Sequence, residues 1–578
     1  MPTKTIREEL HDLLWESIKN AHKEGLFVHN ESLDKDTDAI GKVVRERTFY
    51  TMKHSSRLDH GDYSLPIMEL AQYSNATALE VAQQLCALLQ ENEAFSSYCS
   101  RCEAVAPGYI NFYLAPSALI RQAHDTFKNT SPRFVQVGKG EKLNLEFVSV
   151  NPTGELHVGH ARTAFYGDVL GRVLSASGYD VTREYYINNA QHSVQIQELG
   201  KTVQGEGESY KGEYLDTKIA QHRDEIERCK SYAEAGYVMA GAIQKDIAAF
   251  LEQKAGIAFD VWKEEEDLYE NNGRAIREVI DLLKSRVQVS EEQMTEDDEM
   301  FDSGTMGDLV YESEGALWLR TKELGLSQDN VLVRSNGENT YFLADIAYHV
   351  DKLKRGFTTL IDIWGADHQG HKPRLSAAVQ EVYGEDISPF QFHILIAQLV
   401  RLKNGEKLSK RKGTIITMSD MIDAVGVDVA RYFYLTKSLN SQMEFDLDLA
   451  TQTTNKNPVY YIQYTNARIC SIVKKAEECG ERPEPSALDE LHTEQEMRLL
   501  RSIVRTPDVV EEVAQHYQVH LLSSFVLEVA RQFNQFYRDC RVIEDGTVHK
   551  ARLALVATTG VVLQSTLDLM GISHPDSM

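Results

Sequence analysis

Cysteine is scarce in this chain, with seven residues among 578. A small, odd number of thiols is typical of a reducing compartment and argues against a disulfide-stapled secreted domain. Cys99 and Cys102 form one CxxC, but no second pair and no nearby CxxH completes a set of zinc ligands. We interpret the two residues as ordinary, partly buried thiols, with a metal or redox site as the alternative, and predict no metal site.

Long apolar runs are also missing. No stretch of about eighteen apolar residues occurs, so the sequence predicts no membrane-spanning helix. The N-terminus lacks the apolar core of a signal peptide, and its acidic residues argue against a transit peptide. Apolar residues instead recur there at helical spacing, at Ile6, Leu10, Leu14 and Ile18. We therefore expect an amphipathic helix at the start of a cytoplasmic protein.

Positive charge is in the minority, with 61 Lys and Arg against 87 Asp and Glu and a net charge of −26. A uniformly acidic surface would repel a polyanion, because phosphate neutralisation supplies much of the affinity for nucleic acid. The charge is uneven, however: acid concentrates in 290–302, and base in 42–47 and 403–412. A nucleic-acid-binding function therefore requires a polarised molecule that is basic on one side.

The pattern along the chain predicts several domains, as its length also does. The N-terminal part mixes helical stretches with a strand-like segment, Pro107 to Leu114, and no strand is predicted beyond residue 420. We predict an α/β protein with a Rossmann-type parallel sheet between an α+β domain and an all-α domain. The predicted parts are 1–135, the mixed domain; 136–420, the sheet domain with an insertion at about 190–310; 421–455, a helical junction; and 456–578, the helical domain.

A strand, a tight turn and a helix follow one another from residue 143 onward. Leu143, Leu145 and Phe147 alternate with polar residues, as in a strand, and the turn Asn151-Pro-Thr-Gly154 ends the alternation. Apolar residues at three- and four-residue steps follow from Val158. This element pair opens a nucleotide-binding α/β sheet.

Two histidines stand where that helix begins. His157 and His160 are three residues apart and share one helix face, beside the free backbone N–H groups that favour anions. Gly159 has no Cβ, so a flat ring such as adenine can approach the backbone. The arrangement predicts a cradle for a nucleoside triphosphate. The alternative is a pair of surface histidines with a packing glycine.

A basic segment, Lys407-Leu-Ser-Lys-Arg-Lys-Gly413, follows about 250 residues later. By itself it could be a solvated charged turn, and no GxxxxGK[ST] loop competes for a nucleotide. In this order on one α/β frame, the two motifs resemble the HIGH and KMSKS signatures of class I aminoacyl-tRNA synthetases. Amino-acid activation adds negative charge to the phosphate oxygens of ATP, so its catalysis needs positioned donors and cations. Our hypothesis places His157 and His160 on the α-phosphate side, and Lys407 and Lys410 on the pyrophosphate side.

Other segments resemble the arginyl-tRNA synthetase family in particular, and the likeness covers essentially the whole chain. They are Glu146 to His160, Tyr185 to Asn189, Tyr341 to His349, Val459 to Tyr464, Pro107 to Leu114 and the end of the chain from Lys550. The family likeness implies an arginine–tRNA ligase, which activates L-arginine with ATP and transfers it to the 3′ end of tRNA(Arg). It further implies ATP with Mg²⁺, a monomer, and no membrane partner.

Carried over by position, the resemblance places Tyr341 and Asp345 at the substrate guanidinium, four residues apart on one face if the segment is helical. A carboxylate suits a guanidinium fork. The alternatives are a surface acid or structural ion pair for Asp345, and a strand acid for Glu146. The other implied contacts are Glu146, Asn151 and Gln369 with the α-amino and carboxylate end of arginine, and Gly159, Asp367, His368 and Ser409 with ATP.

The C-terminal part resembles the anticodon-binding domain of the family, and the N-terminal part the domain that touches the corner of the tRNA. The implied anticodon residues are Tyr461, Tyr464, Tyr537 and Met578. Each tyrosine could instead pack between helices. The chain departs from the family at Thr465-Asn466, where Ala-His is usual, and at Asn336, where Asp is usual.

Two rival functions remain at this point. One is another class I ligase or nucleotidyltransferase that activates a different acid. The other is a non-catalytic RNA-binding relative that kept the fold, against which the intact His157, Gly159, His160, Lys407 and Lys410 argue. Pyrophosphate exchange with each amino acid in turn distinguishes the three possibilities.

Overall fold

The computed structural model describes most of the chain and leaves seven stretches undescribed. The described ranges are 5–27, 51–55, 58–128, 135–285, 309–387, 389–403 and 416–578. The predicted lysine-rich segment Lys407–Gly413, the acidic segment 290–302 and the basic segment 42–47 therefore lie outside the described residues.

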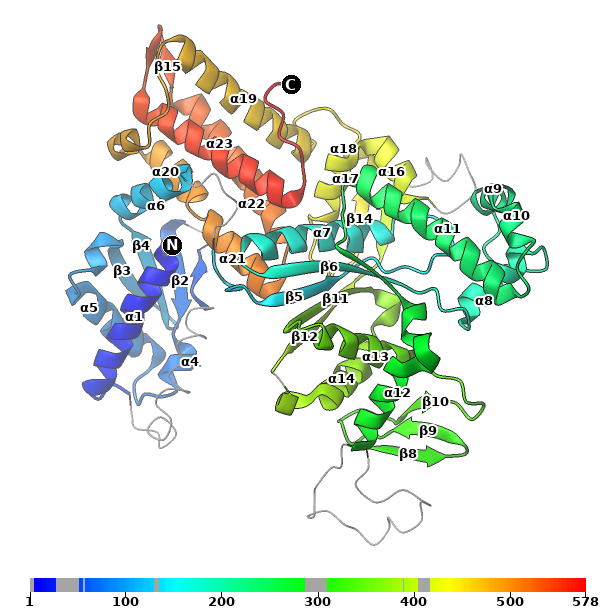
Figure 1. Ribbon diagram of the computed structural model, residues 1–578. Coiled ribbons are helices and arrows are strands. Elements are labelled where there is room, and N and C mark those ends of the chain that lie inside the picture. Colours follow the sequence, from blue (N-terminus) through cyan, green and yellow to red (C-terminus); the bar gives the residue numbers. More distant parts are fainter. Residues whose placement is uncertain are drawn as a thin grey trace.

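A five-stranded parallel sheet forms the centre of the molecule, in the order β12-β11-β5-β6-β7. Helix α7 covers one face, and α13 and α14 lie on the other (Figure 1). This confirms the predicted Rossmann-type α/β class. The bounds are β5 Lys142–Glu146, β6 Asp180–Ile187, β7 Val261–Glu264, β11 Thr359–Gly365, β12 Gln391–Ala397, α7 His160–Ala176, α13 Tyr341–Lys354 and α14 Lys372–Ile387.

The order in which strands are added to this sheet switches sides at β5. From β5 it proceeds through β6 to β7 on one side, and it later returns to β11 and β12 on the other. The loops that follow β5 and β11 therefore leave the same edge of the sheet at the topological switch point. Open α/β sheets bind ligands at this point.

The segment predicted from its alternation as a strand is β5, and polar as well as apolar residues of this strand are buried. Leu143 and Leu145 are buried, but Asn144 and Glu146 are buried as well. Both faces of a parallel sheet are covered, so polar strand residues face a helix rather than solvent.

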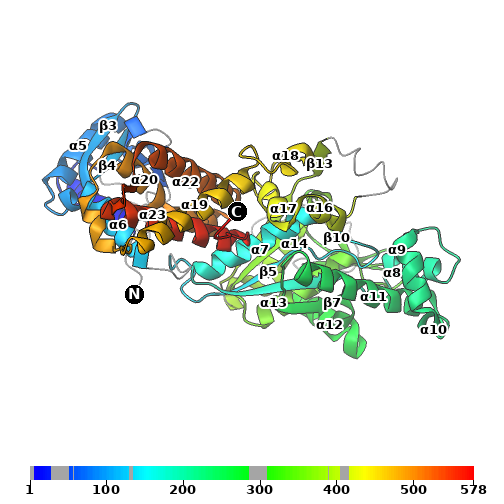
Figure 2. The same ribbon diagram turned by 90° about the horizontal axis from the view of Figure 1, so that it is seen from above.

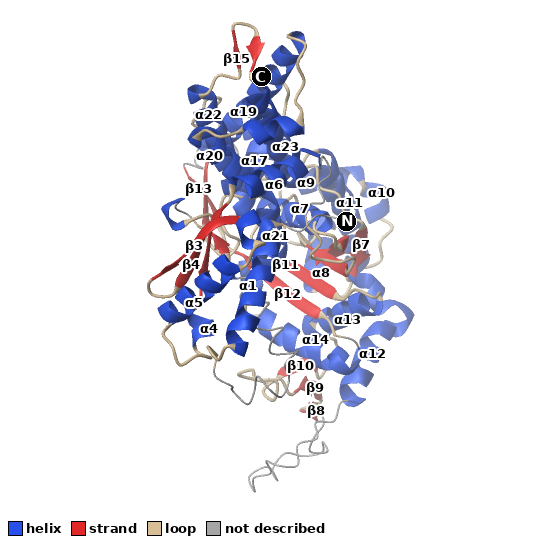
Figure 3. Cartoon of the chain, turned by 90° about the vertical axis from the view of Figure 1, so that its left-hand side faces the viewer, coloured by secondary structure: helices blue, strands red, loops and turns tan. Residues whose placement is uncertain are grey.

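The predicted insertion at about 190–310 contributes to the sheet, since it contains β7. Most of its described residues form helices that project from one end of the molecule (Figure 2). An antiparallel sheet, β10-β9-β8, lies at the opposite end from β15 (Figure 3). The bounds are α8 Val194–Val203, α9 Glu213–Gln221, α10 Arg223–Ile226, α11 Tyr232–Gln253, α12 Glu270–Ser285, β8 Val310–Ser313, β9 Ala316–Leu319 and β10 Asn330–Val333.

The N-terminal part is an α+β unit with an antiparallel sheet, β1-β2-β4-β3. All four predicted helix-face residues of α1 are buried, and Pro107 to Leu114 contains β4. Cys99 and Cys102 are buried free thiols on β3. The bounds are α1 Ile6–Lys23, β1 Lys53–His54, β2 Tyr63–Pro66, α4 Met68–Ala71, α5 Ala78–Glu91, β3 Cys99–Val105, β4 Tyr109–Leu114 and α6 Pro116–Lys128.

The C-terminal part is helical, but the prediction of no strand beyond residue 420 was wrong. Strand β14 lies in the predicted helical junction and pairs in parallel with β13, and β15 and β16 form a short hairpin. Four-residue and two-residue strands leave too little periodicity to detect. The bounds are β13 Val400–Lys403, α16 Met418–Val425, α17 Val427–Tyr434, β14 Met443–Asp446, α18 Leu447–Ala450, α19 Pro458–Glu478, α20 Glu494–Ile503, α21 Thr506–His516, α22 His520–Asp539, β15 Ile543–Glu544, β16 Thr547–Val548 and α23 Lys550–Met570.

Helix α23 is long and apolar enough, by length and composition, to cross a membrane. Most of its apolar window is buried inside the protein, where it packs against α19, α20 and α22. Its hydrophobicity is therefore that of a core helix in a bundle.

The N-terminal and C-terminal parts are joined by buried ion pairs. Arg7 of α1 donates to Glu511 of α21, and His54 Nε2 lies 2.7 Å from Asp508 Oδ2. The Tyr63 hydroxyl donates to the same carboxylate. Arg7, Tyr63, Asp508 and Glu511 are buried, so the N-terminal unit packs directly against α21.

Candidate active site

The two histidines of the predicted cradle are held by the backbone of the turn into α7. The His157 N–H donates to His160 Nδ1 at 3.2 Å, and the Gly159 N–H donates to His157 Nδ1 at 3.0 Å. The rings stack with centroids 3.5 Å apart. Since both Nδ1 atoms accept hydrogen bonds, each neutral ring carries its proton on Nε2 and can donate from there.

Burial keeps both rings uncharged at neutral pH. Burial, together with the nearby His157, lowers the pKa of His160 to about 3. Burial also lowers the pKa of His157. The pair therefore offers neutral N–H donors rather than cations to an anion.

Gly159 is needed for a local reason. A Cβ at this position would lie 2.8 Å from His157 Cε1 and 2.9 Å from Nδ1. Any side chain would therefore displace the His157 ring from its stack. The predicted approach of adenine to this glycine stays a prediction.

Residues on both sides of the undescribed segment 404–415 contact the cradle. Val158 N donates to Ile416 O at 3.2 Å, and Met418 N donates to Leu156 O at 2.7 Å. On the other side, Arg162 of α7 donates to the backbone carbonyl of Gln398. Lys407, Ser409 and Lys410 themselves lie outside the described residues, so their convergence with His160 stays a prediction.

The turn that follows β5 is strained and held by β6. Val148 and Ser149 have φ of 70° and 40°, which non-glycine residues rarely adopt. Tyr186 N donates to Ser149 Oγ at 3.1 Å, and Asn188 Nδ2 donates to Ser149 O at 3.2 Å. The Tyr185–Asn189 motif therefore fixes the backbone that leads to Asn151, whose side chain is exposed.

Helix α13 presents the two residues implied for the guanidinium. Tyr341 is its first residue, 44% exposed, and its hydroxyl donates to Gln195 Oε1 at 2.8 Å. Asp345 lies one turn later and accepts from His371 Nε2 at 2.7 Å. Arg374 Nε donates to His371 Nδ1 at 2.6 Å, which leaves the His371 proton on Nε2. The Asp345 carboxylate thus accepts a hydrogen bond from one neutral group, the His371 imidazole.

A second carboxylate, Glu265, lies close to Asp345 and was missed by the sequence reasoning. It is 3% exposed, and burial, followed by the charge of Asp345, raises its pKa to about 7. Among the described residues no Lys, Arg or His forms an ion pair with Glu265. The hydroxyl of buried Tyr186, which interacts with both acids, has no hydrogen-bond partner in the described part of the chain.

Glu265 is placed by its neighbours on both sides. Asn189 Nδ2 donates to Glu264 Oε2 at 2.9 Å, and Gln191 N donates to Glu266 Oε2 at 2.9 Å. Glu265 between them turns inward. The acidic run after β7 was the visible signal, but nothing in its spacing pointed to Asp345.

Glu146, at the end of β5, is 4% exposed. Its Oε2 accepts from Lys352 Nζ at 2.6 Å. Glu146, His349 and Asp362 have ligand atoms within 4.8 Å of one another, the spacing of a metal site. The Lys352 ammonium already bridges two of these three groups.

The loop after β11 leaves the sheet beside that of β5. Asp367 and His368 lie in a short 3-10 helix, Ala366–His368, and Gln369 ends it. All three side chains are exposed, and His368 Nε2 lies 3.3 Å from Asp367 Oδ2. These residues and the cradle share the edge of the sheet at which ligands bind.

A cavity of 640 Å³ opens beside Tyr341 and extends over β9 and β10. Three cationic residues line it, Lys322, Arg334 and Arg374, together with Tyr311 and Trp318, whose rings stack 6.3 Å apart. Cations and flat rings are the groups that single-stranded nucleic acid binds.

Two of the predicted anticodon residues come together on the helical domain. The Arg468 guanidinium lies 4.8 Å from the Tyr464 ring centroid and 5.2 Å from that of Tyr537. Both tyrosines are exposed, at 37% and 39%. Tyr461 is partly buried and packs against the core, and its role at the anticodon stays a prediction.

The end of the chain lies along α19. Buried Asn466 donates from Nδ2 to His574 O at 3.1 Å and to Pro575 O at 3.0 Å. Gln463 donates to Ser573 O at 2.9 Å. The departure from the family at Asn466 thus holds the segment that ends at exposed Met578.

Comparisons with known families agree with this geometry. A family model for the class I (R) tRNA synthetase catalytic domain matches residues 126–453. Models for the arginyl tRNA synthetase N terminal domain and the DALR anticodon binding domain match 30–114 and 462–578. The fold and the matched catalytic-domain model are those of a class I aminoacyl-tRNA synthetase.

Whole-chain likenesses are more specific. An arginine–tRNA ligase of Syntrophotalea carbinolica is 37% identical over 90% of this chain and 93% of its own length. That of Bacillus subtilis is 36% identical over 99% of this chain and 100% of its own. The solved Campylobacter jejuni arginyl-tRNA synthetase has a TM-score of 0.68 at 28% identity, covering 80% of this chain and 100% of that one. The chain belongs to the arginyl-tRNA synthetase family.

Proposed function

We propose that this enzyme activates L-arginine with ATP and transfers it to the 3′ end of tRNA(Arg). An arginine carboxylate oxygen attacks the α-phosphorus, pyrophosphate leaves, and arginyl-adenylate forms. The ribose hydroxyl of the terminal tRNA nucleotide then displaces AMP. The observation that carries the choice of arginine is the pair of neighbouring acids Asp345 and Glu265.

The guanidinium of arginine lies between these two carboxylates, with the Tyr341 hydroxyl at its edge. A planar fork of donors can bond to both acids, and its charge opposes the burial and the Asp345 charge that raise the pKa of Glu265. Citrulline, ornithine and lysine would leave one acid poorly paired. Sites built on polar partners discriminate by roughly 10⁴-fold. Glu146, Asn151 and Gln369 hold the α-amino and carboxylate end.

His157 and His160 donate from Nε2 to the α-phosphate oxygens as negative charge grows on them. Preorganised donors of this kind stabilise the transition state without reorganising. Gly159, Asp367 and His368 hold the nucleoside. Lys407, Ser409 and Lys410 belong to the pyrophosphate side, because residues 416–418, which follow that segment, are bonded to residues 156–158.

ATP would bind as its Mg²⁺ complex, because this ion prefers phosphate oxygens and water as ligands. The 3′ end of the tRNA reaches Tyr341 through the cavity lined by Lys322, Arg334 and Arg374. Tyr461, Tyr464, Tyr537 and Met578 form the anticodon surface, and the N-terminal unit contacts the corner of the tRNA.

The enzyme acts as a monomer in the cytoplasm. Its apolar helices are buried within the one chain, and its seven cysteines are free thiols, as in a reducing compartment. Light scattering at micromolar concentration tests the monomer.

The function is tested by ATP–pyrophosphate exchange with each of the twenty amino acids, with and without bulk tRNA, followed by charging of total tRNA. Only arginine should support exchange and charging. Support by another amino acid instead would assign a different ligase. In the same assay, Lys410→Ala should slow adenylate formation strongly while leaving the thermal midpoint unchanged.

A further inference from the structure

Three acidic residues form a row across the middle of the sheet. Asp362 of β11 is in register with Glu146 of β5, and Glu146 with Glu184 of β6. All three are buried, at 0%, 4% and 0% exposure. Side chains at one level of adjacent parallel strands point to the same face, here the face covered by α13.

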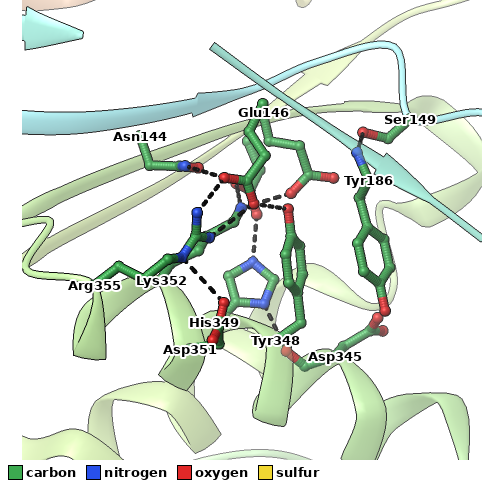
Figure 4. A network of polar contacts seen from close by, with 12 residues as sticks. Asn144, Glu146, Ser149, Tyr186, Asp345, Tyr348, His349, Asp351, Lys352 and Arg355 are labelled. Carbon is green, nitrogen blue, oxygen red and sulfur yellow. Dashed lines mark hydrogen bonds and ion pairs between the residues drawn. The ribbon is translucent and has the colours of Figure 1, made fainter. Parts of the chain in front are cut away.

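Helix α13 meets this row with a matching row of basic groups at three-residue steps, His349, Lys352 and Arg355, its C-terminal cap residue (Figure 4). Lys352 Nζ donates to Glu146 Oε2 at 2.6 Å and to Asp362 Oδ1 at 2.9 Å. His349 Nε2 lies 2.6 Å from Asp362 Oδ2. Arg355 donates to both oxygens of Glu184, at 2.7 and 2.9 Å.

Lys352 is the member that joins this row to the arginine site. Burial lowers its pKa, but the charges of Asp362 and Glu146 outweigh burial and keep the pKa raised. Burial raises the pKa of Glu146, and the Lys352 charge opposes that rise. Lys352 therefore helps to keep a fully enclosed carboxylate ionised.

Only one oxygen of Glu146 is held in this way. Within the described ranges, no residue donates to its Oε1. Lys352 approaches from α13, the same helix that carries Tyr341 and Asp345. The ammonium thus sets the orientation of the carboxylate and ties the guanidinium-binding helix to the strand that ends in Glu146.

We propose that Lys352 is a positioning residue for arginine binding, which acts by orienting Glu146 and never touches the substrate. The inference rests on the proposed contact between Glu146 and arginine. Asp362 is the second partner of the Lys352 ammonium, and His349 in turn holds Asp362.

A purely structural ion pair is the competing explanation, and it makes different predictions. Removing one partner of a buried pair destabilises the fold. It would not by itself raise the KM for arginine while sparing that for ATP. Arg355 offers a matched control, because it pairs with Glu184 on the same face and does not contact Glu146.

The test is a double-mutant cycle in arginine-dependent pyrophosphate exchange with tRNA present. Lys352→Met should raise the KM for arginine by roughly 10- to 100-fold, the range of a charge-assisted hydrogen bond. The KM for ATP should stay within about twofold, and Arg355→Met should leave the arginine KM near wild type. In the Glu146→Gln background, Lys352→Met should add nothing further.

The measurements distinguish a failure of the proposed Glu146–arginine contact from a failure of the positioning role of Lys352. If Glu146→Gln leaves the arginine KM unchanged, the proposed contact of Glu146 is wrong. If Glu146→Gln raises it but the Lys352→Met effect simply adds, the positioning role is overturned.

A second variant covers the chance that Lys352→Met does not fold. Lys352→Met with Asp362→Asn removes one charge of each sign, so the melting temperature should recover while the arginine KM stays raised. Recovery of both would show a structural role and overturn the proposal.

Discussion

The imidazole rings of His157 and His160 lie 3.5 Å apart, and each Nδ1 accepts a backbone N–H. The protein thus fixes the tautomer of both rings before any ligand binds. The two Nε2–H groups remain as the donors for an anion. The cradle is preorganised as a pair of neutral dipoles, and fixed positive charge must come from elsewhere.

His160→Gln should retain more activity than His160→Asn. The glutamine amide nitrogen can take the place of Nε2, whereas that of asparagine lies near Nδ1. Loss of one preorganised donor costs about 10²- to 10³-fold in rate. Single-turnover adenylate formation measures the difference, with thermal midpoints as the control for folding. Equal rates for the two variants would contradict donation from Nε2.

Arginine binding should release a proton below about pH 7. The pKa of Glu265 is raised to about 7 in the free enzyme, and a bound guanidinium would lower it. The carboxyl group is therefore protonated before binding at acidic pH and ionised after it. Titration calorimetry at pH 6.5 in buffers of different ionisation enthalpy counts the proton. Glu265→Gln should release none, and wild type should release none at pH 8.5.

Glu265→Gln should also stabilise the free enzyme at alkaline pH while impairing arginine binding. The folded-state pKa of Glu265 is about 7 against a usual 4.5, so its contribution to stability is lost as pH rises between these values. The full cost of the ionised group is on the order of 3 kcal/mol. Urea unfolding at pH 5 and pH 8 tests this. If the difference in unfolding free energy between Glu265→Gln and wild type does not grow with pH, the prediction is wrong.

Tyr464→Ala and Tyr537→Ala should each raise the KM for tRNA(Arg) in aminoacylation. An exposed ring that stacks on a base contributes about 1–3 kcal/mol, and each ring also flanks Arg468. The arginine and ATP KM values should not change. The thermal midpoints of both variants are the control for folding. Unchanged tRNA affinity in both alanine variants would remove these residues from the anticodon surface.

Asn466→Ala should detach the end of the chain from α19. It removes two hydrogen bonds to the backbone of His574 and Pro575 and leaves those carbonyls unpaired, at a cost of about 1–3 kcal/mol. If the tail positions Met578 at the tRNA, the tRNA KM should rise, and deletion of residues 574–578 should have the same effect. Protease sensitivity of the tail provides an independent measurement.

Features set by neighbours within a few residues were predictable. The buried face of α1 and the strand–turn–helix around His157 follow from spacing, and α13 begins at Tyr341 with Asp345 one turn later. The short strand β14 was not predictable, since four residues carry little periodicity and its partner lies in a distant segment. The parallel sheet itself followed from the order of elements.

The sequence by itself determined where helices and turns begin in this protein. These features depend on hydrogen bonds and side-chain spacing between residues that are close together along the chain. Only the tertiary structure decided that Glu265 lies beside Asp345 and that Lys352 bridges Glu146 and Asp362. These contacts join strands and helices that are far apart in the sequence. Burial of the side chains and their neighbouring charges shift the pKa values of these groups. Burial and long-range packing leave no local periodicity in the sequence.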